Sequence, residues 1–137
     1  MGSQSQEIVT GEGYAVGCLD ALGEGPGFRK IRPGLGVTAF GINAIVLPPG
    51  YDTGGHAHEI QEETYFVHAG HVTITFGDGA THELEAGGLA RVDPTTVRSI
   101  RNVGDVEAVI VVAGGRGGYV ERDGIRVTQG GFVGDAA

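Results

Sequence analysis

The chain has 137 residues, which is enough for one domain with a buried core. Its formal net charge of −8 argues against nucleic acid and anionic membrane surfaces as partners. Its one cysteine, Cys18, excludes an intramolecular disulfide, and no apolar run approaches the length of a membrane span. Because the chain also starts without a charged-then-apolar leader, we expect a soluble, cytoplasmic protein.

Short apolar runs separated by turn residues follow one another along the chain, and helical patterns are nearly absent. The 27 glycines show no collagen period, so we interpret them as tight turns between short strands. Val72, Ile74 and Phe76 alternate with threonines, which is typical of a half-buried strand. Strands are expected, in chain order, within residues 8–19 and at 37–47, 63–69, 71–76, 81–85, 89–92, 97–102, 108–113, 119–121 and 125–128.

Three turns between these strands are predicted to form hairpins. The strands on either side of Gly70 are expected to pair with each other, with the bend at the glycine. Asp78-Gly79 and Asp123-Gly124 are both two-residue signals for a tight hairpin turn.

Two further stretches carry expectations about burial. The continuous apolar run at 108–113 predicts a strand that is covered on both faces. The basic residues Arg29, Lys30 and Arg32 predict a solvated loop edge, with an anion or subunit contact as the alternative.

The spacing of strands and turns indicates an all-β sandwich or barrel. No internal repeat is visible, so a single domain is expected. Residues 7–128 are expected to form it, between a disordered N-terminal tail at 1–6 and a C-terminal tail at 129–137.

Two histidines and an acid are the main candidates for a functional site. Residues two apart in an extended chain point to the same side, so His56 and His58 can converge on one point. Glu63 follows after a short gap and opens an apolar run. Two imidazoles and one carboxylate form a facial set that leaves coordination positions open. The pattern predicts a site for one divalent transition metal (Fe, Mn, Ni or Zn), with a metal-free protein as the alternative.

The stretch around these residues resembles the first motif of the cupin superfamily, which reads Gly, five residues, His-x-His, three or four residues, Glu, six residues, Gly. Five positions agree with this spacing: Gly50, His56, His58, Glu63 and Gly70. The resemblance implies a double-stranded β-helix, or jelly-roll barrel, with its core at about residues 37–113. Cupins include dioxygenases, isomerases, decarboxylases, epimerases, sensor domains and storage proteins, so the resemblance does not select a function.

The second cupin motif is only partly present. Pro94 and Asn102 align with it, but Arg98 stands at the histidine position and Thr96 at the glycine position. A protonated guanidinium has no lone pair, so Arg98 cannot replace the missing ligand. The chain looks most like the small single-domain cupins that read His-x-His-x-x-Gln-Glu-Glu and later Pro-x-x-x-Arg.

Arg98 is expected to point into the barrel, on the same side of its strand as the apolar Ile100. A buried arginine needs a partner. Two partners are open, namely the Glu63 carboxylate and an anionic ligand held bidentately. Tyr65 shares a face with Glu63 and is a candidate for contacting substrate, with a place in the core as the alternative.

Other polar residues near the motif have weaker expectations. Gln61 and Glu62 are candidates for supporting contacts behind the ligands. For Glu62 this would be a contact to the second nitrogen of a histidine, with a solvent-facing position as the alternative. His68, His71 and His82 are expected to have no metal role.

Three functions are compatible with these residues. The first is a metal-binding cupin that holds a small anionic organic molecule at Arg98, and as an enzyme it would be a metal-dependent oxygenase of the dioxygenase type or an isomerase. The second is a non-catalytic, metal-free cupin that binds or senses a small molecule, with Arg98 paired to Glu63 or to a carboxylate ligand. The third is a structural barrel with a vestigial site. A homodimer is expected from the resemblance and from the need to cover strand edges.

Overall fold

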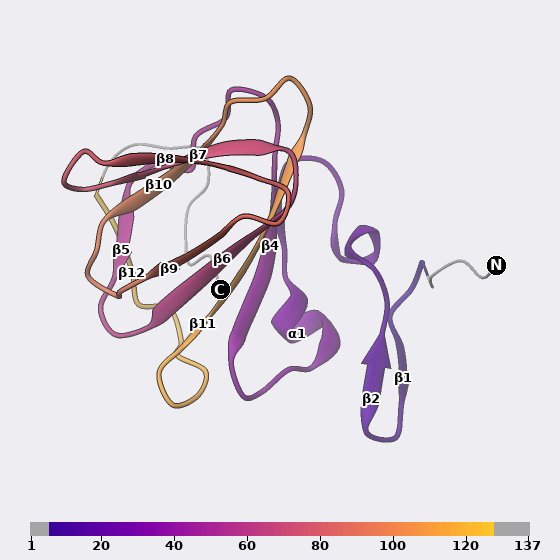
Figure 1. Ribbon diagram of the computed structural model, residues 1–137. Coiled ribbons are helices and arrows are strands. Elements are labelled where there is room, and N and C mark those ends of the chain that lie inside the picture. The colour runs from indigo at the N-terminus through magenta and orange to yellow at the C-terminus, as the bar shows by residue number, and fades with distance from the viewer. Residues whose placement is uncertain (1–5, 128–137) are drawn as a thin grey trace.

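The computed structural model describes residues 6–127, which fold mainly into antiparallel β-strands (Figure 1). Two five-stranded sheets form the body of the molecule, and a separate two-stranded hairpin projects from it. Sheet 1 has the strand order β3-β4-β11-β6-β9, and sheet 2 has the order β12-β5-β10-β7-β8. The elements are β1 (Val9–Gly11), β2 (Tyr14–Val16), the 3-10 helix η1 (Leu19–Leu22), β3 (Gly27–Arg29), α1 (Ile31–Leu35), β4 (Gly41–Leu47), β5 (His56–His58), β6 (Glu62–Ala69), β7 (His71–Phe76), β8 (Thr81–Glu85), β9 (Leu89–Val92), β10 (Arg98–Asn102), β11 (Ala108–Gly115) and β12 (Gly124–Arg126).

The hydrophobic core fills the space between the two sheets, because each strand turns alternate side chains inward. β6 shows the pattern clearly, since it buries Glu63, Tyr65 and Val67 and exposes the residues between them. The buried apolar cluster consists of Ile45, Leu47, Tyr65, Val67, Val72, Ile74, Val92, Ile100, Ala108, Ile110 and Val112. The architecture confirms the expected all-β jelly-roll barrel.

The chain crosses from one sheet to the other at Gly70. The predicted hairpin between β6 and β7 is therefore wrong, because β6 pairs with β9 and β11 whereas β7 pairs with β8 and β10. Gly70 has a φ of +93°, and a Cβ at this position would lie 2.7 Å from the Cα of Ala108. Glycine is required here both by the backbone conformation and by the close approach of β11.

One of the other two predicted hairpin turns is confirmed. Asp78 and Gly79 join β7 to β8, and the Asp78 carboxylate accepts a hydrogen bond of 2.9 Å from the Ala80 N–H. The hairpin predicted at Asp123-Gly124 is wrong, because β12 pairs with β5 and residues 119–121 form no strand. Residue 128, the end of that predicted strand, lies outside the described residues.

The strand that is buried on both faces is β4. Residues of β11 alternate between buried and half-buried, so the double coverage predicted for 108–113 is wrong. The outer face of β4 is buried because α1, which the sequence pattern did not predict, packs against it. β4 begins at Gly41 rather than at residue 37, since α1 ends in a left-handed Gly36 and a short loop follows.

The basic stretch before α1 is more buried than expected. Arg29 is buried, and its Nη2 donates a hydrogen bond of 2.7 Å to the Gly25 carbonyl oxygen. The guanidinium carbon of Arg32 lies 4.0 Å from the centroid of the Tyr119 ring, which is cation–π distance. The solvated loop edge predicted here is therefore wrong for both arginines, whereas Lys30 is exposed.

The hairpin formed by β1 and β2 stands apart from the barrel in Figure 1. Among residues 6–127, no helix is long and apolar enough to cross a membrane. Apart from Gln6, the expected tails at 1–6 and 129–137 lie outside the described residues.

Candidate metal centre

The two sheets bring the predicted ligands together inside the barrel. His56 and His58 lie at the two ends of β5 in sheet 2, and Glu63 lies near the start of β6 in sheet 1. One ligand atom from each of the three residues lies within 4.8 Å of the others. His58 and Glu63 are fully buried and His56 is half-buried, so His56 is the member of the set closest to solvent.

The atoms that would hold a metal have no hydrogen-bond partner. His56 Nε2, His58 Nε2 and Glu63 Oε2 are all buried, and none of them makes a hydrogen bond. Leaving a buried polar atom unpaired costs about 1–3 kcal/mol, so three such atoms facing one point need an explanation. A divalent cation would accept all three lone pairs at once, and the residues present therefore fit the metal that the sequence predicts.

Asp123 orients the ligand His58 from behind. Its Oδ1 lies 2.7 Å from His58 Nδ1 and 2.6 Å from Gln61 Nε2. Its Oδ2 accepts hydrogen bonds from the backbone N–H groups of Ile60 (2.8 Å) and Gln61 (2.9 Å). A carboxylate at Nδ1 keeps the proton on that nitrogen and leaves Nε2 with a lone pair for a metal.

The pKa values of these groups follow from burial and from their neighbours. Burial, together with the charge of Arg98, lowers the pKa of His56 to about 4, so this imidazole is neutral at pH 7. Burial also opposes protonation of His58, but its contacts with Glu63 and Asp123 raise its pKa above the ordinary value. Burial would raise the pKa of Glu63, but His58, Tyr65 and Arg98 together hold it below the ordinary value.

Arg98 points into the barrel beside the three ligands. It is fully buried, and it lies opposite His56 in the pairing of β10 with β5. Its Nη1 donates to the carbonyl oxygens of Pro94 (3.2 Å) and Thr96 (2.9 Å), while Nη2 lies 3.7 Å from Glu63 Oε1. Its Nε is buried without a partner. Backbone carbonyls therefore anchor one end of the guanidinium, and its other donors face the centre.

Tyr65 and Gln61 also belong to this cluster, whereas Glu62 does not. The Tyr65 hydroxyl donates a hydrogen bond of 2.7 Å to Glu63 Oε1, and its ring is part of the core. Gln61 is fully buried, and its Nε2 lies 3.3 Å from His58 Nδ1. Glu62 is exposed and pairs with Arg91 at 3.4 Å, which is the solvent-facing alternative.

Asp123 is the site residue that the sequence did not reveal. It lies 65 residues after His58, in the turn before β12, and reads in the sequence as a turn signal. Only the pairing of β12 with β5 places it beside the motif. The remaining histidines, His68, His71 and His82, are exposed or half-exposed and lie outside the cluster, as expected.

The charges around the centre leave a small positive excess for a bound metal ion. A divalent ion and Arg98 bring three positive charges, and the carboxylates of Glu63 and Asp123 offset two of them. The centre would therefore carry a net charge of about +1, with the histidines neutral. Without Asp123 the excess would be about +2, so this carboxylate relieves part of the repulsion between the metal and Arg98.

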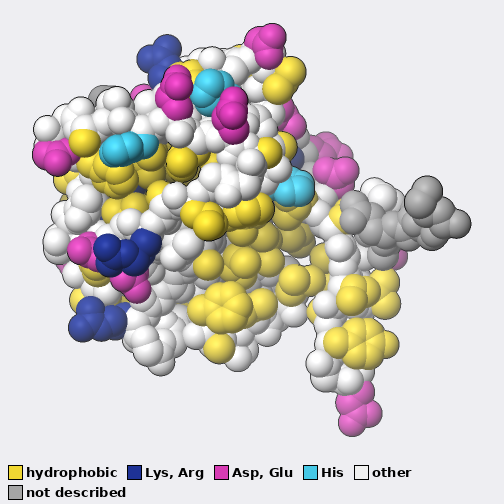
Figure 2. Space-filling view, in the orientation of Figure 1, with side chains coloured by type: hydrophobic (Ala, Val, Ile, Leu, Met, Phe, Trp, Pro, Cys, Tyr) yellow, Lys and Arg dark blue, Asp and Glu magenta, His cyan; other side chains and the backbone are white. Residues whose placement is uncertain are grey.

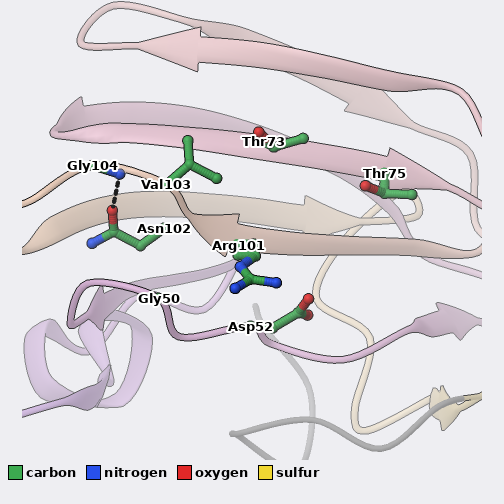
Figure 3. Close-up of a pocket in the computed structure, with 8 residues that line it drawn as sticks. All are labelled: Gly50, Asp52, Thr73, Thr75, Arg101, Asn102, Val103 and Gly104. Carbon is green, nitrogen blue, oxygen red and sulfur yellow. Dashed lines mark hydrogen bonds between the residues drawn. The ribbon is translucent and has the colours of Figure 1, made fainter.

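A separate hollow lies on the opposite face of β10. It has a volume of about 580 Å³, and Figure 3 shows the side chains around it. Arg101 belongs to it and is exposed, whereas Arg98 lies three residues earlier and points inward. The hollow is lined by Gly50, Asp52, Thr73, Thr75, Arg101, Asn102, Val103 and Gly104, so it is distinct from the candidate metal centre.

Known proteins share this fold and parts of this sequence. A cupin protein from Bacteroides fragilis is 26% identical with a TM-score of 0.60, over 72% of this chain and 81% of that one. A sugar phosphate isomerase from a cupin superfamily, from Silicibacter pomeroyi, is 25% identical with a TM-score of 0.59, over 65% of this chain and 58% of that one. A predicted oxalate decarboxylase from Thermotoga maritima is 26% identical with a TM-score of 0.51, over 54% of this chain and 64% of that one.

Each of the last two comparisons spans less than two thirds of the other protein, and no curated protein matches this chain significantly. The family model named Cupin domain matches residues 44–114, just over half of the chain. The match includes all three candidate ligands and Arg98. This protein belongs to the cupin family.

Proposed function

We propose that this protein binds one divalent transition metal through His56, His58 and Glu63 and holds a small organic anion beside it. The observation that carries the proposal is the set of three buried ligand atoms that face one another without hydrogen-bond partners. The fixed orientation of His58 by Asp123 supports it, since ligating histidines are usually held in this way.

The positive excess at the centre identifies the charge of the ligand. A metal ion, Arg98 and the two carboxylates would sum to about +1, so a monoanion would neutralise the site. The buried Nε–H of Arg98 has no partner and would donate to one oxygen of that anion. A small carboxylate or enolate with one oxygen on the metal and another on Arg98 meets both requirements.

As an enzyme the protein would be a metal-dependent isomerase or an oxygenase of the dioxygenase type. A bound metal would act as a Lewis acid on a carbonyl or enolate oxygen, or would activate oxygen if it is iron. Arg98 would hold the anion in place, and the Tyr65 hydroxyl would keep Glu63 ionised and oriented. Resemblance to a sugar phosphate isomerase favours the isomerase among these reactions.

Metal analysis of protein prepared without an affinity tag tests the metal part of the proposal. We expect one transition metal per chain, and we expect His56→Ala to lower the metal affinity more than about 100-fold, since removing a ligand exceeds the effect of removing a supporting contact. His82→Ala is the matched control, because His82 is exposed and lies outside the cluster. Unchanged stoichiometry and affinity in His56→Ala would show that these ligands are wrong.

Titration with small carboxylates tests the anion part. Arg98→Met should abolish binding of the anion, whereas Arg101→Met on the opposite face of β10 should not. Circular dichroism establishes whether each variant is folded before its affinity is compared. Equal anion affinity in folded Arg98→Met and in the parent protein would refute this role of Arg98.

A metal-free binding protein is the second candidate. The distance of 3.7 Å between Arg98 Nη2 and Glu63 Oε1 favours it, because this contact occupies the carboxylate with a cation. In that case protein treated with a chelator should bind small carboxylates as tightly as untreated protein does. Loss of anion binding on metal removal, restored by adding the metal, would exclude this alternative.

A further inference from the structure

The β1–β2 hairpin exposes large apolar side chains that nothing in the described part of the chain covers. Val9, Tyr14 and Val16 are 46%, 62% and 51% exposed. The hairpin has only three residues in each strand, and an isolated hairpin of two strands is marginally stable in water. A partner surface would account for its order and for its composition. We call this hairpin the arm.

The outer face of sheet 1 carries a second set of exposed apolar side chains. Leu89, Phe66 and Val111 are cross-strand neighbours on β9, β6 and β11, so they form one row on that face. Leu89 is 65% exposed and Phe66 is 38% exposed. Phe40, which is 45% exposed, lies against the same face, where it borders a hollow together with Thr64 and Ala113 of β6 and β11.

These residues define a strip that is open where the rest of the face is covered. α1 packs against β4 at one side of sheet 1 but leaves β6, β9 and β11 uncovered. Figure 2 shows apolar side chains gathered in the middle of the visible face and others on the hairpin beside it. The strip consists of Phe40, Phe66, Leu89, Val109, Val111 and Ala113.

We infer that the arm of one chain packs on the strip of a second copy of the same chain, and that the contact is reciprocal. The exposed apolar surface of the arm and strip together is on the order of 500 Å² per chain, so a symmetric pair would bury about 1,000 Å². That area reaches the lower limit for a specific interface. The two surfaces differ from each other, and a two-fold axis satisfies both of them at once.

The charges beside the two surfaces agree with this pairing. Glu12 is exposed at the tip of the arm, and no Lys or Arg occurs between Gln6 and Phe28. Arg116 is exposed and borders the same hollow as Phe40 at the edge of the strip. An acidic arm therefore meets a basic residue, which favours this orientation although both chains are acidic overall.

Analytical ultracentrifugation of the full chain tests the inference. The parent protein should sediment at twice the chain mass of 14.0 kDa. Tyr14→Glu on the arm and Phe66→Glu on the strip should each weaken the dimer at least tenfold. Val106→Glu is the matched control, because Val106 is 60% exposed in the loop before β11 and belongs to neither surface. All three sites are exposed, and circular dichroism checks that the variants are folded.

Mixing the two variants distinguishes this arrangement from other dimers. A heterodimer of Tyr14→Glu with Phe66→Glu has one intact contact, between the normal arm of one chain and the normal strip of the other. The mixture should therefore contain more dimer than either variant alone. A monomeric parent protein, a Tyr14→Glu variant that dimerises normally, an equal effect of Val106→Glu, or no gain on mixing would each overturn the inference.

Discussion

Replacing Asp123 by asparagine would test how the end of the chain controls the metal centre. The carboxylate receives two donors at each oxygen: the His58 ring and the Gln61 side chain at Oδ1, and two backbone N–H groups at Oδ2. Asparagine has the same shape but only one carbonyl oxygen. In either rotamer its NH₂ group must face one pair of donors, so two hydrogen bonds are lost.

The size of the effect follows from this count. Two lost hydrogen bonds to a charged, mostly buried acceptor destabilise the fold by about 2–4 kcal/mol. If the NH₂ group faces His58 Nδ1, that nitrogen must become the acceptor and the ring proton moves to Nε2, where the metal would bind. Supporting contacts of this kind are worth about 10–100-fold in metal affinity, which is the loss expected here.

Competition with a chelator for Zn²⁺ or Mn²⁺ at neutral pH measures this loss in the folded variant. Asp78→Asn is the control, since Asp78 also accepts a backbone N–H but lies in the exposed turn between β7 and β8. A folded Asp123→Asn protein that binds metal as tightly as the parent would refute the reasoning about His58. Equal losses in both variants would show that the effect is general and not local to the centre.

Three further results are expected. Metal affinity should fall as pH is lowered through the raised pKa of His58, because the proton competes for the ligand nitrogen, and chelator competition across a pH series measures it. In the metal-free protein, His58 stabilises the fold below pH 6.5 and loses this effect as pH rises, while the lowered pKa of His56 destabilises the fold as pH falls below 6.5 towards 4, so the thermal midpoint should be highest near pH 6.5. Gly70→Ala should lower the free energy of unfolding by more than about 3 kcal/mol, since it combines backbone strain with a clash against Ala108.

The other pH and backbone results have clear opposites. A thermal midpoint that rises steadily from pH 6.5 to 9 in the presence of a chelator would contradict the raised pKa of His58. For the glycine, the matched control is Gly79→Ala, which has a φ of +90° but no atom within 4 Å of an added Cβ. It should cost only the strain, about 1–2 kcal/mol. Equal losses at both positions would mean that the clash is not felt.

The sequence was sufficient for the features that depend on local spacing. The pleat alternation that places Glu63 and Tyr65 on one face, and Arg98 and Ile100 on one face, holds in the structure. The turn at Asp78 and its neighbour was also predictable, because two residues determine it.

Features that depend on strand pairing across the barrel were not predictable in this way. Gly70 looks like a hairpin turn, but the crossing between the sheets becomes visible only when β6 and β7 are paired with other strands. Asp123 had the same difficulty, since a turn residue and a buried hydrogen-bond acceptor are identical in the sequence. The inward side of Arg98 followed from alternation, but its anchoring by the Pro94 and Thr96 carbonyls did not.

The position of Asp123 also has a consequence for biosynthesis. The ribosome makes the His-x-His segment 65 residues before the acid that orients it, and β12 is the last strand of the described chain. A nascent chain can thus close most of the barrel before its imidazoles are held in their final tautomer. Tight capture of the cation would be a late event in maturation, and a truncated translation product would fold its sheets without retaining the ion.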